Sequence, residues 1–131
     1  YHVLWGRYLK ILLDTHIFLW LLMEPKKLSK HHSELIASKE NRVYLSSISL
    51  TEIAIKSSIG KLDIPFDPYQ KALESNIALE SYKPETYFIL RRMPFHHKDP
   101  FDRMLIAQAK TEGFLLMTVD ERIKEYDVNY I

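Results

Sequence analysis

Hydrophobic positions along the chain fall into short apolar runs and into longer stretches where apolar residues recur at helical spacing. Short runs rich in aliphatic and aromatic residues predict buried strands, and the longer stretches predict helices. The predicted strands are residues 10–13, 42–46, 77–80 and 114–118, with 128–131 as an edge strand. The predicted helices are residues 16–23, 30–39, 50–59, 69–76, 84–93, 100–112 and 120–125. Strands that alternate with helices indicate an α/β sandwich with a parallel sheet.

Proline and glycine mark several of the predicted helix ends. Pro25 and Pro94 each follow an apolar helical stretch, and Pro100 suits the first position of the next helix. Gly60 and Gly113 stand where a helix commonly ends. Only three glycines occur in the chain, so neither a P-loop nor a GxGxxG motif can be built from them.

Composition describes an ordinary globular domain. The 131 residues are 47% hydrophobic and 27% charged, which fits one domain over residues 1–131. A net charge of +1 gives no general basic field for nucleic acid, so such binding would depend on local patches. The chain has no cysteine, which excludes disulfides, thiolate zinc sites and a cysteine nucleophile, and is compatible with the cytoplasm.

The apolar stretch over residues 11–23 predicts neither a membrane span nor a signal peptide. It is interrupted by Asp14, Thr15 and His16 and is shorter than the roughly 20 residues that a spanning helix needs. It also lacks a small-residue cleavage site. Because the sequence begins with Tyr1, residues 1–9 are interpreted as a trimmed start or a cloning remnant.

Four acidic residues stand at comparable places relative to the predicted elements. Asp14, Glu52 and Asp120 each follow a predicted strand near a helix start, and Asp102 opens a helix. In a parallel sheet such positions meet at the carboxyl edge of the strands. Carboxylates gathered there repel one another unless a cation lies between them, so the pattern favours a divalent metal and phosphodiester cleavage.

Each acid also has a purely structural interpretation. Asp14 is a good helix N-cap, and Ser49 with Glu52 forms a plausible capping box. Asp99 before Pro100 is a cap, and Asp120 or Thr118 could cap the last helix. Taken alone, Glu52 is better explained as part of the capping box, so only the joint pattern points to metal.

Several motifs resemble those of the PIN domain, in the branch of VapC-type toxins of prokaryotic toxin–antitoxin pairs. The motifs are Leu12-Leu13-Asp14-Thr15-His16 with Trp20, Ser46-Ser47-Ile48-Ser49-Leu50-Thr51-Glu52, His97-Lys98-Asp99-Pro100-Phe101-Asp102-Arg103, Leu105-Ile106-Ala107-Gln108-Ala109 and Thr118-Val119-Asp120. The resemblance runs from about Lys10 onward in the same order. It implies a three-layer α/β/α sandwich with a central, mainly parallel sheet. It also implies a Mg²⁺- or Mn²⁺-dependent endoribonuclease, a homodimer and a cognate antitoxin protein.

The resemblance carries the catalytic and metal-binding role to four acids, Asp14, Glu52, Asp102 and Asp120. Magnesium prefers oxygen ligands and is usually held by one or two carboxylates, so these acids suit one ion or two. A histidine as the main ligand is disfavoured because no HxxxH pair occurs.

Other residues are expected to support that centre. Thr15, Ser47 and Asp99 are candidates for hydrogen bonds behind the ligands, although the two hydroxyls are better explained by helix starts. Arg103 and His97 are candidates for contacts with the RNA phosphates.

Two other classes of protein compete with this interpretation. A phosphatase of the aspartyl-phosphate type also places an aspartate after its first strand, but it generally needs a second aspartate two residues later, where this chain has His16. A non-catalytic PIN-fold binding or regulatory module would keep the fold alone, and the presence of all four acids argues against it.

Overall fold

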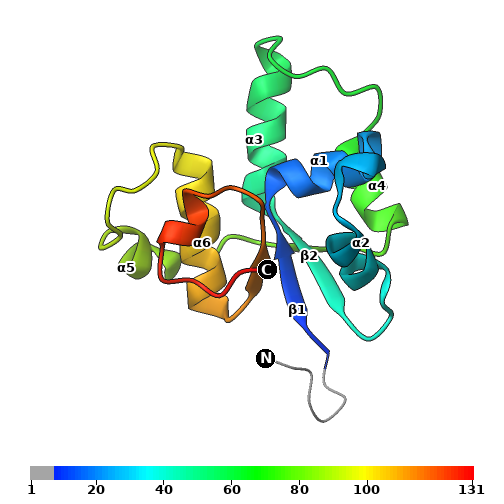
Figure 1. Ribbon diagram of the computed structural model, residues 1–131. Coiled ribbons are helices and arrows are strands. Elements are labelled where there is room, and N and C mark those ends of the chain that lie inside the picture. The colour runs from blue at the N-terminus through cyan, green and yellow to red at the C-terminus, as the bar shows by residue number, and fades with distance from the viewer. Residues whose placement is uncertain (1–7) are drawn as a thin grey trace.

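A four-stranded parallel sheet forms the centre of the computed structural model, which describes residues 8–131 (Figure 1). Its strands are β1 (Lys10–Leu13), β2 (Arg42–Ser46), β3 (Ala78–Glu80) and β4 (Leu115–Met117). They lie in the order β3-β2-β1-β4, and every paired strand is parallel to its neighbour. Residues 1–9, which the sequence analysis interprets as a trimmed start or a cloning remnant, lie mostly outside the described residues.

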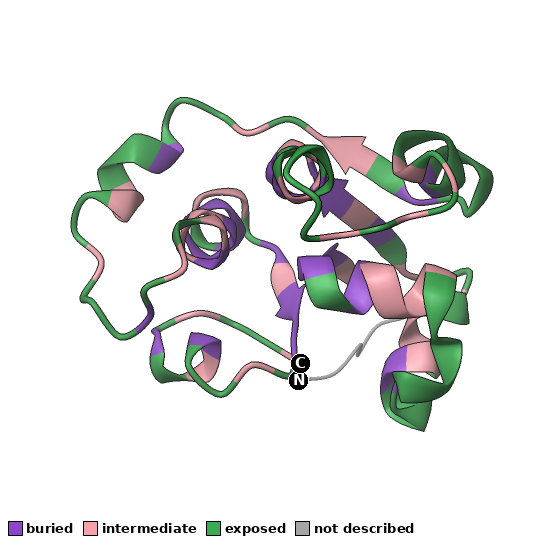
Figure 2. Cartoon of the chain, turned by 90° about the horizontal axis from the view of Figure 1, so that it is seen from above, coloured by how far each residue is buried: buried purple, intermediate pink, exposed green. Residues whose placement is uncertain are grey.

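Helices connect the strands and cover both faces of the sheet, as Figure 2 shows from above. They are α1 (Thr15–Met23), α2 (Lys30–Ala37), α3 (Ser47–Ser58), α4 (Pro68–Glu74), α5 (Thr86–Leu90) and α6 (Pro100–Glu112), with short 3₁₀ turns η2 (Pro25–Lys27) and η3 (Ile123–Glu125). Within the described residues, no helix combines the length and the apolar character that crossing a membrane requires.

Alternate strand residues supply the two halves of the core. Leu13 and Met117 pack with α1 residues such as Phe18 on one face. Leu12 and Leu116 pack with α6 residues such as Leu105 and Ile106 on the other. Neighbouring side chains of a strand point to opposite faces of the sheet. A strand that is buried on both faces therefore has a continuous run of apolar residues in its sequence. This arrangement confirms the predicted three-layer α/β/α sandwich.

Strand β1 lies between β2 and β4, which makes it the point where the chain changes direction across the sheet. The residues that follow β1, β2 and β4 therefore emerge side by side at one edge. In open parallel sheets, ligands bind outside the carboxyl ends of the strands at such a switch point.

Helix α3 begins earlier than predicted. It starts at Ser47 rather than at residue 50, because the Ser46 hydroxyl accepts a 3.0 Å hydrogen bond from Ile48 N and caps the helix. The predicted capping box of Ser49 and Glu52 is therefore wrong, since both residues lie inside the helix. This correction removes the structural interpretation that had competed most strongly at Glu52.

Two predicted helices are reduced to about half their expected length in the structure. The helix expected over residues 84–93 is regular only over α5, and the one expected over 120–125 is reduced to η3. The edge strand expected over 128–131 appears as a single parallel bridge, in which Leu116 pairs with Tyr130 beside β4.

Candidate active site

Asp14 is fixed at the end of β1 by hydrogen bonds to both of its carboxylate oxygens. Its Oδ1 caps α1 by accepting bonds from His16 N at 2.7 Å and Ile17 N at 3.4 Å. Its Oδ2 accepts a 2.7 Å bond from Thr118 Oγ1, which follows β4. The predicted cap is confirmed, and the same carboxylate also joins two strand ends.

The segment after β4 carries Asp120 to the same edge. Asp120 N donates a 3.0 Å hydrogen bond to Thr118 Oγ1, so the Thr118 hydroxyl donates to one acid and accepts from the backbone of another. Asp120 Oδ1 accepts a 2.8 Å bond from Arg122 N, which shapes the turn. Thr118 thus sets the relative position of Asp14 and Asp120.

Glu52 comes from α3 and is 4% exposed. Its Oε2 pairs with Lys56 Nζ at 2.6 Å, one helical turn away. Its Oε1 is buried and has no hydrogen-bond partner within the described part of the chain. An anionic oxygen without a partner is costly to bury, so this atom is available to a cation.

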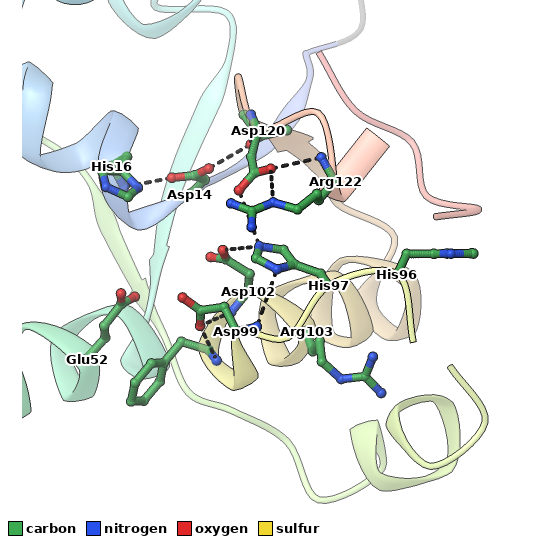
Figure 3. A network of polar contacts seen from close by, with 12 residues as sticks. Asp14, His16, Glu52, His96, His97, Asp99, Asp102, Arg103, Asp120 and Arg122 are labelled. Carbon is green, nitrogen blue, oxygen red and sulfur yellow. Dashed lines mark hydrogen bonds and ion pairs between the residues drawn. The ribbon is translucent and has the colours of Figure 1, made fainter. Parts of the chain in front are cut away.

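The start of α6 supplies the remaining acids. Asp99 Oδ1 caps this helix by accepting bonds from Phe101 N at 2.8 Å and Asp102 N at 3.2 Å. This confirms the predicted cap and leaves Asp102, in the first helical turn, to face the other acids. Figure 3 shows the carboxylates of Asp14, Asp102 and Asp120 around a common centre, with Glu52 approaching from α3.

The loop before α6 places the His97 ring between two of these acids. His97 is 4% exposed, and its Nε2 lies 2.8 Å from Asp102 Oδ2 and 3.2 Å from Asp120 Oδ2. Together the three side chains offer ligand atoms that all lie within 4.8 Å of one another. The sequence had placed His97 on a loop toward RNA and gave no signal that its ring would be buried against the carboxylates.

Electrostatics link all four acids. Burial, and after it the charges of Asp99, Asp14, Glu52 and Asp120, together raise the pKa of Asp102 to about 8. Burial also raises the pKa of Asp14, against the hydrogen bonds from Thr118 and the α1 backbone. These shifts indicate that the centre carries more negative charge than its protein partners neutralise.

Asp120 differs from Asp14 and Asp102. Burial alone would raise its pKa, but the hydrogen bond from Arg122 N and the nearby His97 and Arg122 hold the pKa below its ordinary value. Asp120 therefore stays ionised more readily than Asp14 or Asp102.

The expected supporting hydroxyls have different surroundings. Thr15 Oγ1 donates a 2.9 Å bond to Ser49 Oγ, and both residues are buried between α1 and α3. Ser47 Oγ instead accepts a 3.1 Å bond from Tyr82 N, which ties α3 to the segment after β3. Sequence reasoning predicted neither the bond of Thr15 to Ser49 nor the contact between Thr118 and Asp14, because both depend on which elements become neighbours.

Arg103 is engaged by the loop before α6. Its Nη1 donates 3.0 Å bonds to Pro94 O and to the Tyr126 hydroxyl, and its guanidinium lies over the Phe95 ring at 5.1 Å. The phosphate contact expected for Arg103 would compete with these bonds. Tyr126, which the sequence analysis did not consider, is 6% exposed and contacts the same loop.

The donor set suits a hard divalent cation. Asp14, Glu52, Asp102 and Asp120 offer carboxylate oxygens, which are the ligands that Mg²⁺ and Mn²⁺ favour. The unpartnered Glu52 Oε1 and the raised pKa of Asp102 are what a cation would relieve. The arrangement can therefore bring a metal, a water and a phosphate together at the carboxyl edge of the sheet.

Comparison with known proteins identifies the family of the chain. The family model of the PIN domain matches residues 11–129. Among curated proteins, the chain is 27% identical over 119 residues to Ribonuclease VapC22 of Mycobacterium tuberculosis, covering 88% of this chain and 91% of the relative.

Solved structures share the fold at low sequence identity. One is VapBC2 from Rickettsia felis bound to a promoter DNA fragment, with a TM-score of 0.73, 17% identity and coverage of 94% of this chain and 98% of that one. Another is DNA-bound VapBC from Salmonella typhimurium, with a TM-score of 0.62, 19% identity and coverage of 94% and 97%.

Proposed function

The chain belongs to the PIN domain family, and on this premise we propose that it is a metal-dependent endoribonuclease, the toxin of a toxin–antitoxin pair. One observation carries the proposal: the charges of Asp14, Glu52 and Asp120 all act on the buried carboxyl of Asp102. Burying these carboxylates close together costs free energy unless a cation lies between them. The name of the relative VapC22 supports RNA as the substrate.

We assign the binding of Mg²⁺ or Mn²⁺ to Asp14, Glu52, Asp102 and Asp120. When bound, a divalent ion activates water and neutralises charge on the scissile phosphate. In our proposal Asp14 or Asp120 orients the attacking water and takes its proton. The water oxygen bonds to phosphorus, the bond from phosphorus to the leaving ribose oxygen breaks, and that oxygen takes up a proton from solvent water.

The surrounding residues keep these acids in place. Thr118 fixes Asp14 against Asp120, and Asp99 caps the helix that presents Asp102. Thr15 bonds to Ser49 and so holds the start of α1, which Asp14 caps, against α3, which carries Glu52. Because the acids are held before any ligand arrives, little reorganisation is needed during reaction.

We also propose that the chain pairs with an antitoxin protein, acts on RNA in the cytoplasm and forms a homodimer. The similar solved structures are VapBC assemblies, which supports the first of these. Helix α1 is apolar on most sides, and its Met23 is 40% exposed, which leaves apolar surface for a protein partner. Co-purification with the product of the neighbouring open reading frame would test the pairing.

The function is tested by incubating the purified chain with single-stranded RNA in Mn²⁺ or Mg²⁺. We expect cleavage that EDTA stops and that Asp14→Asn abolishes while the circular dichroism spectrum stays unchanged. Asp127→Asn is the matched control, because the Asp127 side chain is fully exposed and pairs only loosely with Lys110, at 3.8 Å. Full activity in Asp14→Asn would contradict the assignment, and metal binding without cleavage by the unaltered chain would favour the non-catalytic module.

A further inference from the structure

We infer that His97 is a positioning residue that donates a hydrogen bond to Asp102 and Asp120, and that Tyr126 holds it in place. This inference rests on the proposed function, because it explains how two of the proposed metal ligands are kept apart and aligned. It assigns His97 neither to RNA binding nor to metal binding.

The hydrogen bond at the far side of the ring decides which nitrogen carries the proton. Asp99 N lies 3.3 Å from His97 Nδ1 and, as a backbone amide, can only donate. Nδ1 must therefore accept, and in a neutral ring the proton is then on Nε2. That proton points at the carboxylates, because Nε2 lies 2.8 Å from Asp102 Oδ2 and 3.2 Å from Asp120 Oδ2.

The same tautomer argues against metal ligation through Nε2. A metal needs a free lone pair on the nitrogen that binds it, but here that nitrogen carries the hydrogen. His97 therefore lies among groups that could hold an ion without being one of its ligands. Its donor bridges two acids that belong to α6 and to the segment after β4, and it opposes their mutual repulsion.

Tyr126 anchors the loop that carries the ring. Its hydroxyl oxygen accepts hydrogen bonds from His96 N and His97 N, each at 3.0 Å, and from Arg103 Nη1 at 3.0 Å. Arg103 adds a bond to Pro94 O at the start of the same loop. The phenol therefore joins α6, the loop and the C-terminal segment at one point, and these three parts present Asp102, His97 and Asp120.

His97 acts through Asp102 and Asp120 and does not contact RNA in this proposal. Removing its ring should therefore affect catalysis more than RNA binding. Groups that orient metal ligands typically change metal affinity or activity by about 10–100-fold when altered. We expect His97→Leu to lower kcat and Mn²⁺ affinity within about that range, with little change in KM. His97→Gln should recover most of the loss, since its amide can donate from nearly the same position.

Tyr126→Phe tests the anchor, with Tyr82→Phe as its matched control. The Tyr82 hydroxyl also bonds to the backbone of α6, at Met104 O, whereas the Tyr126 hydroxyl bonds to His96 N and His97 N. We expect kcat to fall about 10-fold in Tyr126→Phe and to stay unchanged in Tyr82→Phe. Equal activity in the two variants would overturn the anchoring role.

A measurement without RNA separates this inference from the proposed function. Long-range proton–nitrogen NMR of the metal-free chain reports the tautomer of each histidine, and His97→Gln identifies the His97 signal. We expect the proton on Nε2 alone; a proton on Nδ1 would overturn the inference, as would equal losses of Mn²⁺ affinity in His97→Gln and His97→Leu. A chain that shows the expected tautomer and binds Mn²⁺ but does not cut RNA would refute the proposed function while supporting the donor role of His97.

Discussion

Thr118 donates a 2.7 Å hydrogen bond to Asp14, a residue 104 positions earlier in the chain. The two residues directly follow neighbouring parallel strands, β4 and β1, so the bond closes the sheet edge at the point where the acids meet. The hydroxyl also accepts a bond from Asp120 N, which means that one side chain orders both acids.

Thr118→Val keeps the shape of this side chain and removes both bonds. We expect it to lower the free energy of unfolding by about 1–3 kcal/mol, because the buried Asp14 Oδ2 loses its partner. The rate of RNA cleavage should also fall, because Asp14 and Asp120 lose the side chain that sets their relative position. The control is Thr86→Val, which removes an equally buried hydroxyl whose bond goes to Lys83 O, outside the acid cluster. Urea unfolding and initial cleavage rates measure both effects, and similar cleavage in the two variants would contradict the role of Thr118.

Stability of the metal-free chain should fall as pH rises, and Asp102 sets the direction. Its ordinary pKa is 3.8, and burial with the neighbouring acids raises the folded value to about 8. Between these values the folded chain binds a proton that the unfolded chain has released. The contribution of Asp102 to the free energy of unfolding is therefore greatest below about pH 4. It decreases as the pH rises and is lost by about pH 8, and the whole change amounts to several kcal/mol at most.

Urea unfolding across that pH range checks the Asp102 prediction. Asp102→Asn should flatten the pH dependence, because the amide does not titrate, and saturating Mn²⁺ should flatten it by taking the place of the proton. A metal-free stability that rises steadily through the same window would contradict the raised pKa.

Divalent metal should stabilise the folded chain by mass action. At a Mn²⁺ concentration about 100 times its Kd, the expected gain is about 2.7 kcal/mol, seen as a higher Tm. EDTA should reverse the gain and stop cleavage. Asp14→Asn and Asp102→Asn should show a much smaller increase, whereas an unchanged increase in both would place the metal elsewhere.

Lys56 is expected to compete with metal for Glu52. Its Nζ lies 2.6 Å from Glu52 Oε2, and this ion pair raises the pKa of Lys56. Lys56→Met removes a positive charge beside the site, so Mn²⁺ should bind more tightly while the metal-free chain becomes less stable. Calorimetric titration and urea unfolding measure the two effects.

Lys71→Met gives the matched control for Lys56→Met. Lys71 forms an exposed helical pair with Glu74 at 3.7 Å. Its loss should cost no more than about 1 kcal/mol and should leave Mn²⁺ affinity unchanged. Weaker Mn²⁺ binding in Lys56→Met would indicate that Lys56 helps to place Glu52 rather than competing for it.

The sequence was a good guide to the sheet and to two of the helix caps. Apolar runs located all four strands, because strands buried on both faces leave little room for polar residues. Asp99 and Asp14 were identified as caps, since a cap depends on the next two or three residues only.

Features that depend on distant neighbours were not predicted. Ser46, Ser47 and Ser49 are all good caps, so local preference could not show that α3 begins at Ser47. The bonds of Thr118 to Asp14 and of Tyr126 to the loop before α6 join parts of the chain that only the fold brings together. The position of the His97 ring follows from those bonds rather than from its motif.

The placement of β1 between β2 and β4 has a consequence for protein synthesis. Asp14 is made early, but Thr118 and Asp120 reach it only after β4 has been translated and has paired with β1. A nascent or truncated chain that stops short of Asp120 lacks one of the four proposed metal ligands. We therefore expect an unfinished copy to lack the proposed ribonuclease activity until its last strand has joined the sheet.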